Sequence, residues 1–339
     1  MKNSIINSRQ AFTLLVLVGT IAIASQLSPM QASVDNTVKV DGSSTVYPIT
    51  KEITKNFNAA NPTIKVEVNF SGTTGGFKKF CAGEIDISDA SRPITKTEMA
   101  ACKKAGISYY ELPIAYDALT VVVNPKNTWI KDITVAELKK IWEPSAEGKI
   151  KRWNQIRPEF PNQPITLFAP GKDSGTYDYF NAAINGNATT TRKDVTTSED
   201  DNVLVKGVSQ NPNSLGYFGF AYYETHAKDL KAVAVDSGKG AILPSRQAVE
   251  AGKYQPLARP LFIYVSAKSF RKPEVKSFVN FYLKEAPQSV VTVQYIPLPA
   301  RGYKLAESRL VFGRVGTIFA GKTELNLSIG ELLGKELAL

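Results

Sequence analysis

The sequence predicts an α/β fold in which two lobes are joined by two long strands. Strand-type runs alternate with segments of helical periodicity along most of the chain, as is typical of α/β proteins. Two β-type stretches, 109–123 and 257–265, are candidates for crossings between lobes, and such a pair suits closure about a hinge. The expected parts are a signal peptide (1–32), lobe I (33–115 with 262–315), lobe II (116–261) and a C-terminal amphipathic tail (316–339).

The expected elements repeat the order strand, turn, helix. The strand 37–40 leads into the turn 42–45 and a helix with Val46, Ile49, Ile53 and Phe57 on one face. The strand 65–70 leads into the turn 71–76 and a short helix, and the strand 85–87 leads into 88–93. Further along, the strand 165–168 leads into the turn 171–176 and a helix from about 177 to 184.

The N-terminus has the pattern of a secretory signal peptide. Lys2 and Arg9 precede the apolar run 11–24, which is shorter than the roughly 20 residues that a transmembrane helix needs. Cleavage after Ala24 or Ala32 would release the chain into the periplasm, while a retained membrane anchor is the alternative. No cysteine lies near either bond, so a lipoprotein is not expected.

The charge of the chain fits an anionic ligand without proving one. Lys and Arg number 41 against 31 for Asp and Glu, which gives a net charge of +10. This excess is compatible with a small anion, an acidic surface or nucleic acid. The sequence has no cluster of five or more basic residues and no basic stripe interleaved with aromatics. Nucleic acid is therefore not an expected partner.

Cys81 and Cys102 are the two cysteines of the chain. An even number in an exported protein predicts a disulfide, which would add about 3 kcal/mol of stability, while two free buried thiols are the alternative. Together with the single histidine, His226, they cannot fill a tetrahedral zinc site without carboxylates. Neither a metal nor a cofactor is expected.

Three turns rich in Gly, Ser and Thr open helices, at 42–45, 71–76 and 171–176. The first N–H groups of a helix have no intrahelical partner and carry partial positive charge, and Gly lets a ligand approach the backbone. One such turn is an ordinary helix cap. Three of them, with Arg92 after a strand, predict a site for a small oxyanion. None fits a nucleotide-binding loop.

The segments 40–48, 71–77, 85–93 and 173–176 together resemble the periplasmic phosphate-binding proteins of high-affinity phosphate ABC transporters. The resemblance covers about residues 37–312. It implies a type II periplasmic binding protein fold with two lobes, each a mixed sheet flanked by helices. It also implies a monomeric carrier, active in phosphate starvation, that holds inorganic phosphate in the cleft between the lobes and delivers it to a membrane permease.

The resemblance also assigns site residues. The expected phosphate ligands are Ser44, Thr45, the Val46 backbone, Thr73, Ser91, Arg92, Ser174, Gly175 and Thr176. The best-known members have a binding Asp where this chain has Ser91 and a binding Arg where it has Pro170. Arg92 is therefore expected to replace the missing cation, unless it is a surface residue that caps the strand.

The missing Asp leaves the acceptor of the phosphate proton open. Phosphate near neutral pH can donate a hydrogen bond and sulfate cannot, so a carboxylate in the site would reject sulfate. Asp41, Asp89 and Asp173 are candidates, and the sequence does not choose among them.

Other functions remain open alternatives. A sulfate or molybdate carrier shares the architecture, and a surface protein that binds a partner is a further reading. A phosphoester hydrolase would need Ser44 or Ser174 as nucleophile with His226 as base, but 171–175 does not match the G-x-S-x-G elbow. The tail has Leu325, Leu327 and Ile329 in alternation, followed by leucines at helical spacing. It is expected to dock on its own lobe, with docking on a partner as the alternative.

Overall fold

The computed structural model describes residues 36–338, so the predicted signal peptide lies outside the described residues. These described residues form one compact unit. Among the described residues, no helix combines the length and the apolar character needed to span a bilayer.

A ten-stranded mixed sheet runs through this unit in the order β2-β1-β3-β12-β4-β8-β6-β7, with β13 and β9 also paired to β4. Its strands are β1 Thr37–Gly42, β2 Lys65–Val68, β3 Ile87–Ala90, β4 Tyr109–Val123, β6 Thr166–Pro170, β7 Thr196–Ser198, β8 Ser214–Gly219, β9 Lys231–Ala232, β12 Ala258–Ser266 and β13 Ile296–Pro297. A smaller sheet contains β5 Asp132–Thr134, β10 Ala234–Asp236 and β11 Ala241–Ile242.

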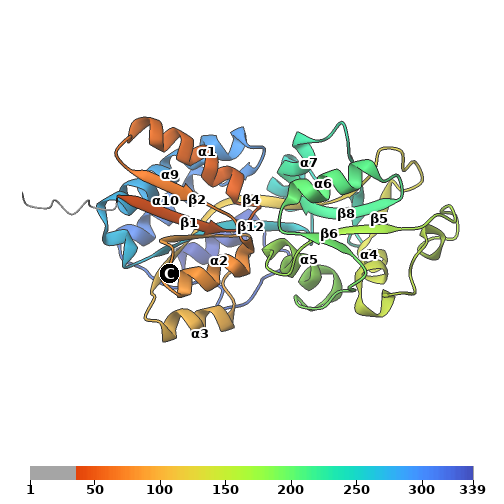
Figure 1. Ribbon diagram of the computed structural model, residues 1–339, viewed down its shortest axis with the longest axis horizontal. Coiled ribbons are helices and arrows are strands. Elements are labelled where there is room, and N and C mark those ends of the chain that lie inside the picture. The colour runs from red at the N-terminus through yellow and green to blue at the C-terminus, as the bar shows by residue number, and fades with distance from the viewer. Residues whose placement is uncertain (1–35, 339) are drawn as a thin grey trace, which may run out of the picture. The chain divides into compact units, whose positions relative to one another are not determined.

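The two predicted crossing strands are β4 and β12. All 15 residues of β4 are buried, including the charged Glu111 and Asp117. Its first part, Tyr109–Ala118, pairs with β12, and its last part, Leu119–Val123, pairs with β8. In Figure 1, β4 and β12 run between the elements around β1–β3, called lobe I below, and those around β6–β8, called lobe II. The two-lobed fold with two crossover strands is thus confirmed, while the borders at 115 and 262 stay predictions.

Helices cover the sheet in both lobes (Figure 1). The helices are α1 Tyr47–Ala60, α2 Gly72–Cys81, α3 Lys96–Lys104, α4 Val135–Trp142, α5 Gly175–Asn185, α6 Asp201–Gln210, α7 Phe220–Thr225, α8 Arg246–Glu250, α9 Pro273–Thr292, α10 Ala300–Val311 and α11 Ile329–Leu337. Short 3-10 turns occupy Pro144–Ala146, Trp153–Gln155 and Ser269–Arg271. The predicted apolar face of α1 is buried, and its Phe57 packs edge-on against Phe278 of α9.

The predicted disulfide is confirmed. Cys81 is the last residue of α2 and is bonded to Cys102 in α3. The bond therefore ties two helices of lobe I whose N-terminal ends carry the residues discussed below.

The C-terminal tail docks on its own chain, as predicted. Leu327 and Leu332 are buried, and the Tyr116 hydroxyl of β4 donates to the Leu327 carbonyl over 3.1 Å. Arg309 of α10 forms a buried ion pair with Glu336 of α11. The alternation around Leu327 does not form a strand, because Asn326 turns the backbone with a φ of 62°.

Candidate ligand-binding site

The three Gly-, Ser- and Thr-rich turns follow β1, β2 and β6 at their carboxyl ends and open α1, α2 and α5. Buried hydroxyls bring them together. Thr45 after β1 is hydrogen-bonded to Thr176 of α5, with 3.1 Å between the two Oγ1 atoms. Thr73 of α2 is hydrogen-bonded to Ser91 after β3, also over 3.1 Å. The site thus combines residues of both lobes, at strand ends where open α/β folds bind ligands.

Gly175 lies at a close approach between α5 and lobe I. A Cβ atom at this position would lie 2.6 Å from both the Ser91 Oγ and the Thr73 Oγ1. Only glycine therefore lets the N-terminus of α5 approach lobe I so closely. On the lobe I side, the Thr74 N–H donates to the Asp173 carbonyl over 2.9 Å.

The remaining predicted ligand groups, on Ser174, Val46 and Ser44, lie at or just before the starts of α5 and α1. Ser174 is the N-cap of α5, where its Oγ accepts from the Thr176 N–H over 3.1 Å, so α5 begins at Gly175 and not at 177. The Val46 N–H donates to the Ser43 carbonyl over 3.2 Å. Ser44 donates to Asp201 of α6 over 3.0 Å.

Arg92 does not present a free donor to a ligand. Its side chain is 3% exposed, so it is not a surface arginine either. Nε donates to Asp178, and the two terminal nitrogens donate to Glu98, Thr74 and the Pro93 carbonyl, over 2.6–3.1 Å. All five N–H groups of a guanidinium are thereby used. These contacts argue against the expected role of Arg92 as a phosphate ligand.

Arg259 is a buried cation beside the predicted site that the sequence pattern did not single out. It lies on β12, is fully buried, and its Nη2 donates to the Thr176 Oγ1 over 2.7 Å and lies 3.4 Å from the Thr45 Oγ1. Its Nη1 has no hydrogen-bond partner within residues 36–338. The sequence feature that could have revealed Arg259 is its position as a single charged residue within the apolar crossing strand, because an isolated charge is rarely buried unless it has a partner or a functional role.

Asp117 of β4 is the counter-ion of Arg259. Its Oδ2 lies 3.0 Å from Nη2, and its Oδ1 accepts from the Phe220 N–H at the start of α7. Burial raises the pKa of Asp117 and outweighs the lowering effect of the adjacent guanidinium. The pair therefore places a charged group on both crossing strands, directly beside the site.

The three carboxylates expected from sequence have other partners. Asp41 accepts from the Gly42 N–H, Ser71 and Lys79. Asp89 accepts from Thr50 of α1, and burial raises its pKa well above the ordinary value. Asp173 pairs with Lys78 and leaves 44% of its side chain exposed. Within the described part of the chain, none of the three carboxylates is bonded to a predicted ligand hydroxyl.

Asp201 is a further carboxylate that the sequence did not single out. It accepts a hydrogen bond from Ser44 and is fully buried at the start of α6. Burial raises the pKa of Asp201 to about 7, and the nearby Asp117 contributes to the increase. It is thus positioned to exchange a proton near neutral pH.

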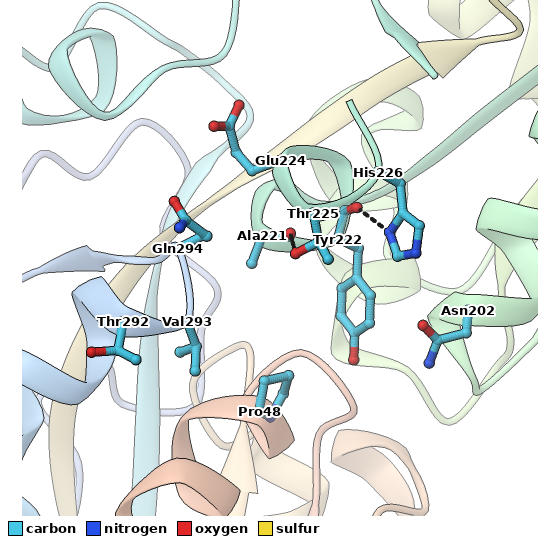
Figure 2. Close-up of a pocket in the computed structure, with 10 residues that line it drawn as sticks. All are labelled: Pro48, Asn202, Ala221, Tyr222, Glu224, Thr225, His226, Thr292, Val293 and Gln294. Carbon is cyan, nitrogen blue, oxygen red and sulfur yellow. Dashed lines mark hydrogen bonds between the residues drawn. The ribbon is translucent and has the colours of Figure 1, made fainter. Parts of the chain in front are cut away.

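A groove of about 550 Å³ lies beside the first turn (Figure 2). It is lined by Pro48, Asn202, Ala221, Tyr222, Glu224, Thr225, His226, Thr292, Val293 and Gln294. The Tyr222 hydroxyl donates to the Ser44 carbonyl, while the His226 Nδ1 is hydrogen-bonded to the Tyr222 carbonyl. Within residues 36–338, neither Ser44 nor Ser174 is bonded to His226, and no group of three or more His, Cys, Asp or Glu residues could hold a metal ion.

Sequence comparisons place the chain among binding proteins. Residues 28–286 match the family model of the PBP superfamily domain. Protein SphX of Synechocystis sp. is 54% identical over 313 residues, which cover 92% of this chain and 93% of that protein. The phosphate-binding protein PstS of Staphylococcus saprophyticus is 35% identical, with 80% of this chain and 84% of that protein covered.

Solved structures give the same result. A possible phosphate binding protein from Planctomyces limnophilus is 45% identical, with a TM-score of 0.62, and the match covers 82% of this chain and 98% of that chain. A protein from Clostridium perfringens, provisionally named a phosphate ABC transporter substrate-binding protein and solved with bound phosphate, is 26% identical, with a TM-score of 0.66. That match covers 78% of this chain and all of the other. The chain therefore belongs to the PBP superfamily and, within it, to the family of phosphate-binding proteins that contains PstS and SphX.

Proposed function

We propose that this protein binds inorganic phosphate between its two lobes and delivers it to an ABC-type import permease. The observation that carries the proposal is Arg259, a buried cation whose Nη2 lies beside the hydroxyls of Thr45 and Thr176 and whose Nη1 has no partner among the described residues. A phosphate taken out of water needs donors that replace its hydration and a charge that offsets its own. The planar guanidinium and the three helix N-termini supply both.

The proposed ligands are those expected from sequence, with one exchange. Ser44, Thr45, the Val46 backbone, Thr73, Ser91, Ser174, Gly175 and Thr176 remain the proposed donors, and Arg259 takes the place of Arg92 as the cation. The hydroxyls that now bond to one another across the site would turn toward the phosphate oxygens. Asp201 is the acceptor that the geometry favours for the phosphate proton, because it is buried and already bonded to Ser44.

The proposed carrier function also assigns roles to the two lobes, the crossing strands and the N-terminal segment. The proposed lobes are 33–115 with 262–315 and 116–261, and β4 and β12 would serve as the hinge between them. Cleavage of residues 1–32 would release a monomer without catalytic activity into the periplasm. Phosphate capture between lobes and release at the permease need no covalent chemistry. The Ser44–Asp201 and His226–Tyr222 hydrogen bonds also favour a carrier over a serine hydrolase.

Titration calorimetry of residues 33–339 with phosphate, sulfate and arsenate tests this function. One phosphate per chain should bind with a Kd of about 1 μM or tighter, which corresponds to about −8 kcal/mol. Above about pH 7, where Asp201 is ionised, sulfate should bind far more weakly, because it cannot donate a hydrogen bond to that carboxylate. Absence of heat at millimolar phosphate would refute the proposal. Turnover of a chromogenic phosphate ester by the same preparation would favour the hydrolase instead.

A further inference from the structure

Arg92 and Asp178 form an ion pair between the lobes. Arg92 directly follows Ser91 in lobe I, and Asp178 lies in the first turn of α5 in lobe II, two residues after Thr176. The Arg92 Nε donates to the Asp178 Oδ2 over 2.6 Å, and the two side chains are 3% and 16% exposed. Each partner is thus adjacent to a proposed ligand, and the bond is largely shielded from water.

Lobe I holds the guanidinium in place from the other side. Glu98 of α3 accepts from both terminal nitrogens, over 2.8 and 2.9 Å, and Thr74 accepts a further bond over 2.9 Å. Glu98 is itself fixed by the N–H and hydroxyl of Thr95 at the start of α3. Because these bonds occupy the terminal nitrogens, Nε is the donor left to reach lobe II.

The electrostatics make this contact depend on the arginine. Asp178 and Glu98 approach the same guanidinium from opposite lobes, and without it two carboxylates would face each other across the contact. Burial raises the pKa of Asp178, and Glu98 raises it further, while Arg92 lowers it. Removal of one partner of a largely buried pair leaves the other charge uncompensated.

We infer that Arg92 is a positioning residue for phosphate binding, which acts through Asp178 and does not contact the ligand. The pair holds the N-terminal turn of α5 against Thr73 and Ser91, and so it determines how long the closed, loaded state lasts. This inference rests on the proposed function. Loss of Arg92 would weaken binding both if Arg92 acts through Asp178 and if it contacts the ligand directly. The experiment must therefore distinguish these two roles.

A double-mutant cycle distinguishes a positioning role of Arg92 from a direct ligand contact. Arg92→Gln, Asp178→Ala and the double variant are compared by the rate of phosphate release, in stopped flow with an excess of a labelled phosphate-binding protein as trap. Each single variant should release phosphate roughly 10-fold faster or more, with an association rate within threefold of the wild type. The double variant should be no faster than the faster single variant, because both changes remove one contact.

Two further measurements complete the test. Arg157 pairs with Glu137 within lobe II over 2.6 Å, so Arg157→Gln is the matched control and should leave release unchanged. Circular dichroism and thermal melts check that the variants fold. If Arg92→Gln fails to fold, Asp178→Ala still tests the inference. If Arg92→Gln accelerates release equally in the Asp178→Ala background, or if Asp178→Ala alone has no effect, the inference is wrong. If the wild type binds no phosphate, the proposed function itself fails.

Discussion

Asp201 is a buried carboxylate beside the site, and its pKa predicts how stability depends on pH. Its folded-state pKa of about 7 exceeds the value of about 3.9 for an unfolded Asp. The folded protein therefore holds this proton more tightly than the unfolded chain. The resulting stability is complete below about pH 4 and is lost as the pH rises to about 7.

Asp201→Asn should remove that loss, because the amide does not ionise. Without phosphate, the difference in Tm between variant and wild type should become more positive from about pH 4.5 to about pH 7.5. Thermal unfolding at several pH values measures this difference. A difference that is constant over the range would mean that Asp201 does not titrate with the raised pKa.

Gly175 is a residue of the site that leaves no room for a side chain. Gly175→Ala would place a methyl group 2.6 Å from two hydroxyls of lobe I, and such overpacking costs about 1–3 kcal/mol. Because the clash arises where the lobes meet, the change should weaken phosphate binding by about 10-fold or more and leave each lobe folded. Calorimetric titration checks this prediction.

Gly330→Ala is the matched control for that change. Gly330 lies in α11, and a Cβ atom there would meet no other described residue within 4 Å beyond the backbone of its own helix. The variant should bind phosphate like the wild type. If Gly175→Ala also binds like the wild type, the lobes do not meet at Gly175 in the loaded protein.

At the scale of elements, the disulfide stabilises α2 and α3 without touching the ligand. Cys81 is at the opposite end of α2 from Thr73. Replacement of both cysteines by Ser should lower the free energy of unfolding by about 3 kcal/mol and change the Kd by less than about threefold. Urea denaturation and calorimetry measure the two quantities. Alkylation of unreduced, denatured wild type should find no free thiol, and two labelled cysteines would contradict the bond.

The elements differ in how far the sequence could predict them. The helix α1 and the three turns were predictable, because apolar spacing and Gly, Ser and Thr at helix starts are local signals. The partners of the arginines were not, because Arg92 lies 86 residues from Asp178 and Arg259 lies 142 residues from Asp117. Which arginine lies beside the site hydroxyls depends on strand pairing, and the pattern around each residue does not reveal it.

At the scale of the whole molecule, β12 explains why Arg259 can serve both lobes. The strand crosses between them, and its arginine reaches Thr45 of lobe I and Thr176 of lobe II from one position. Asp117 on the neighbouring crossing strand fixes the guanidinium. A phosphate bound at this point would contact both lobes and the crossing strands, so its binding would favour a closed arrangement over an open one.

Calorimetric titration of Arg259→Gln with phosphate, beside the wild type, tests this account most directly. The wild type should bind one phosphate per chain, and the variant should bind about 30- to 1000-fold more weakly, a loss of about 2–4 kcal/mol. Arg259→Lys should recover only part of the affinity, because a point charge cannot replace the planar fork of donors. A folded Arg259→Gln protein that binds phosphate within threefold of the wild type would contradict the account.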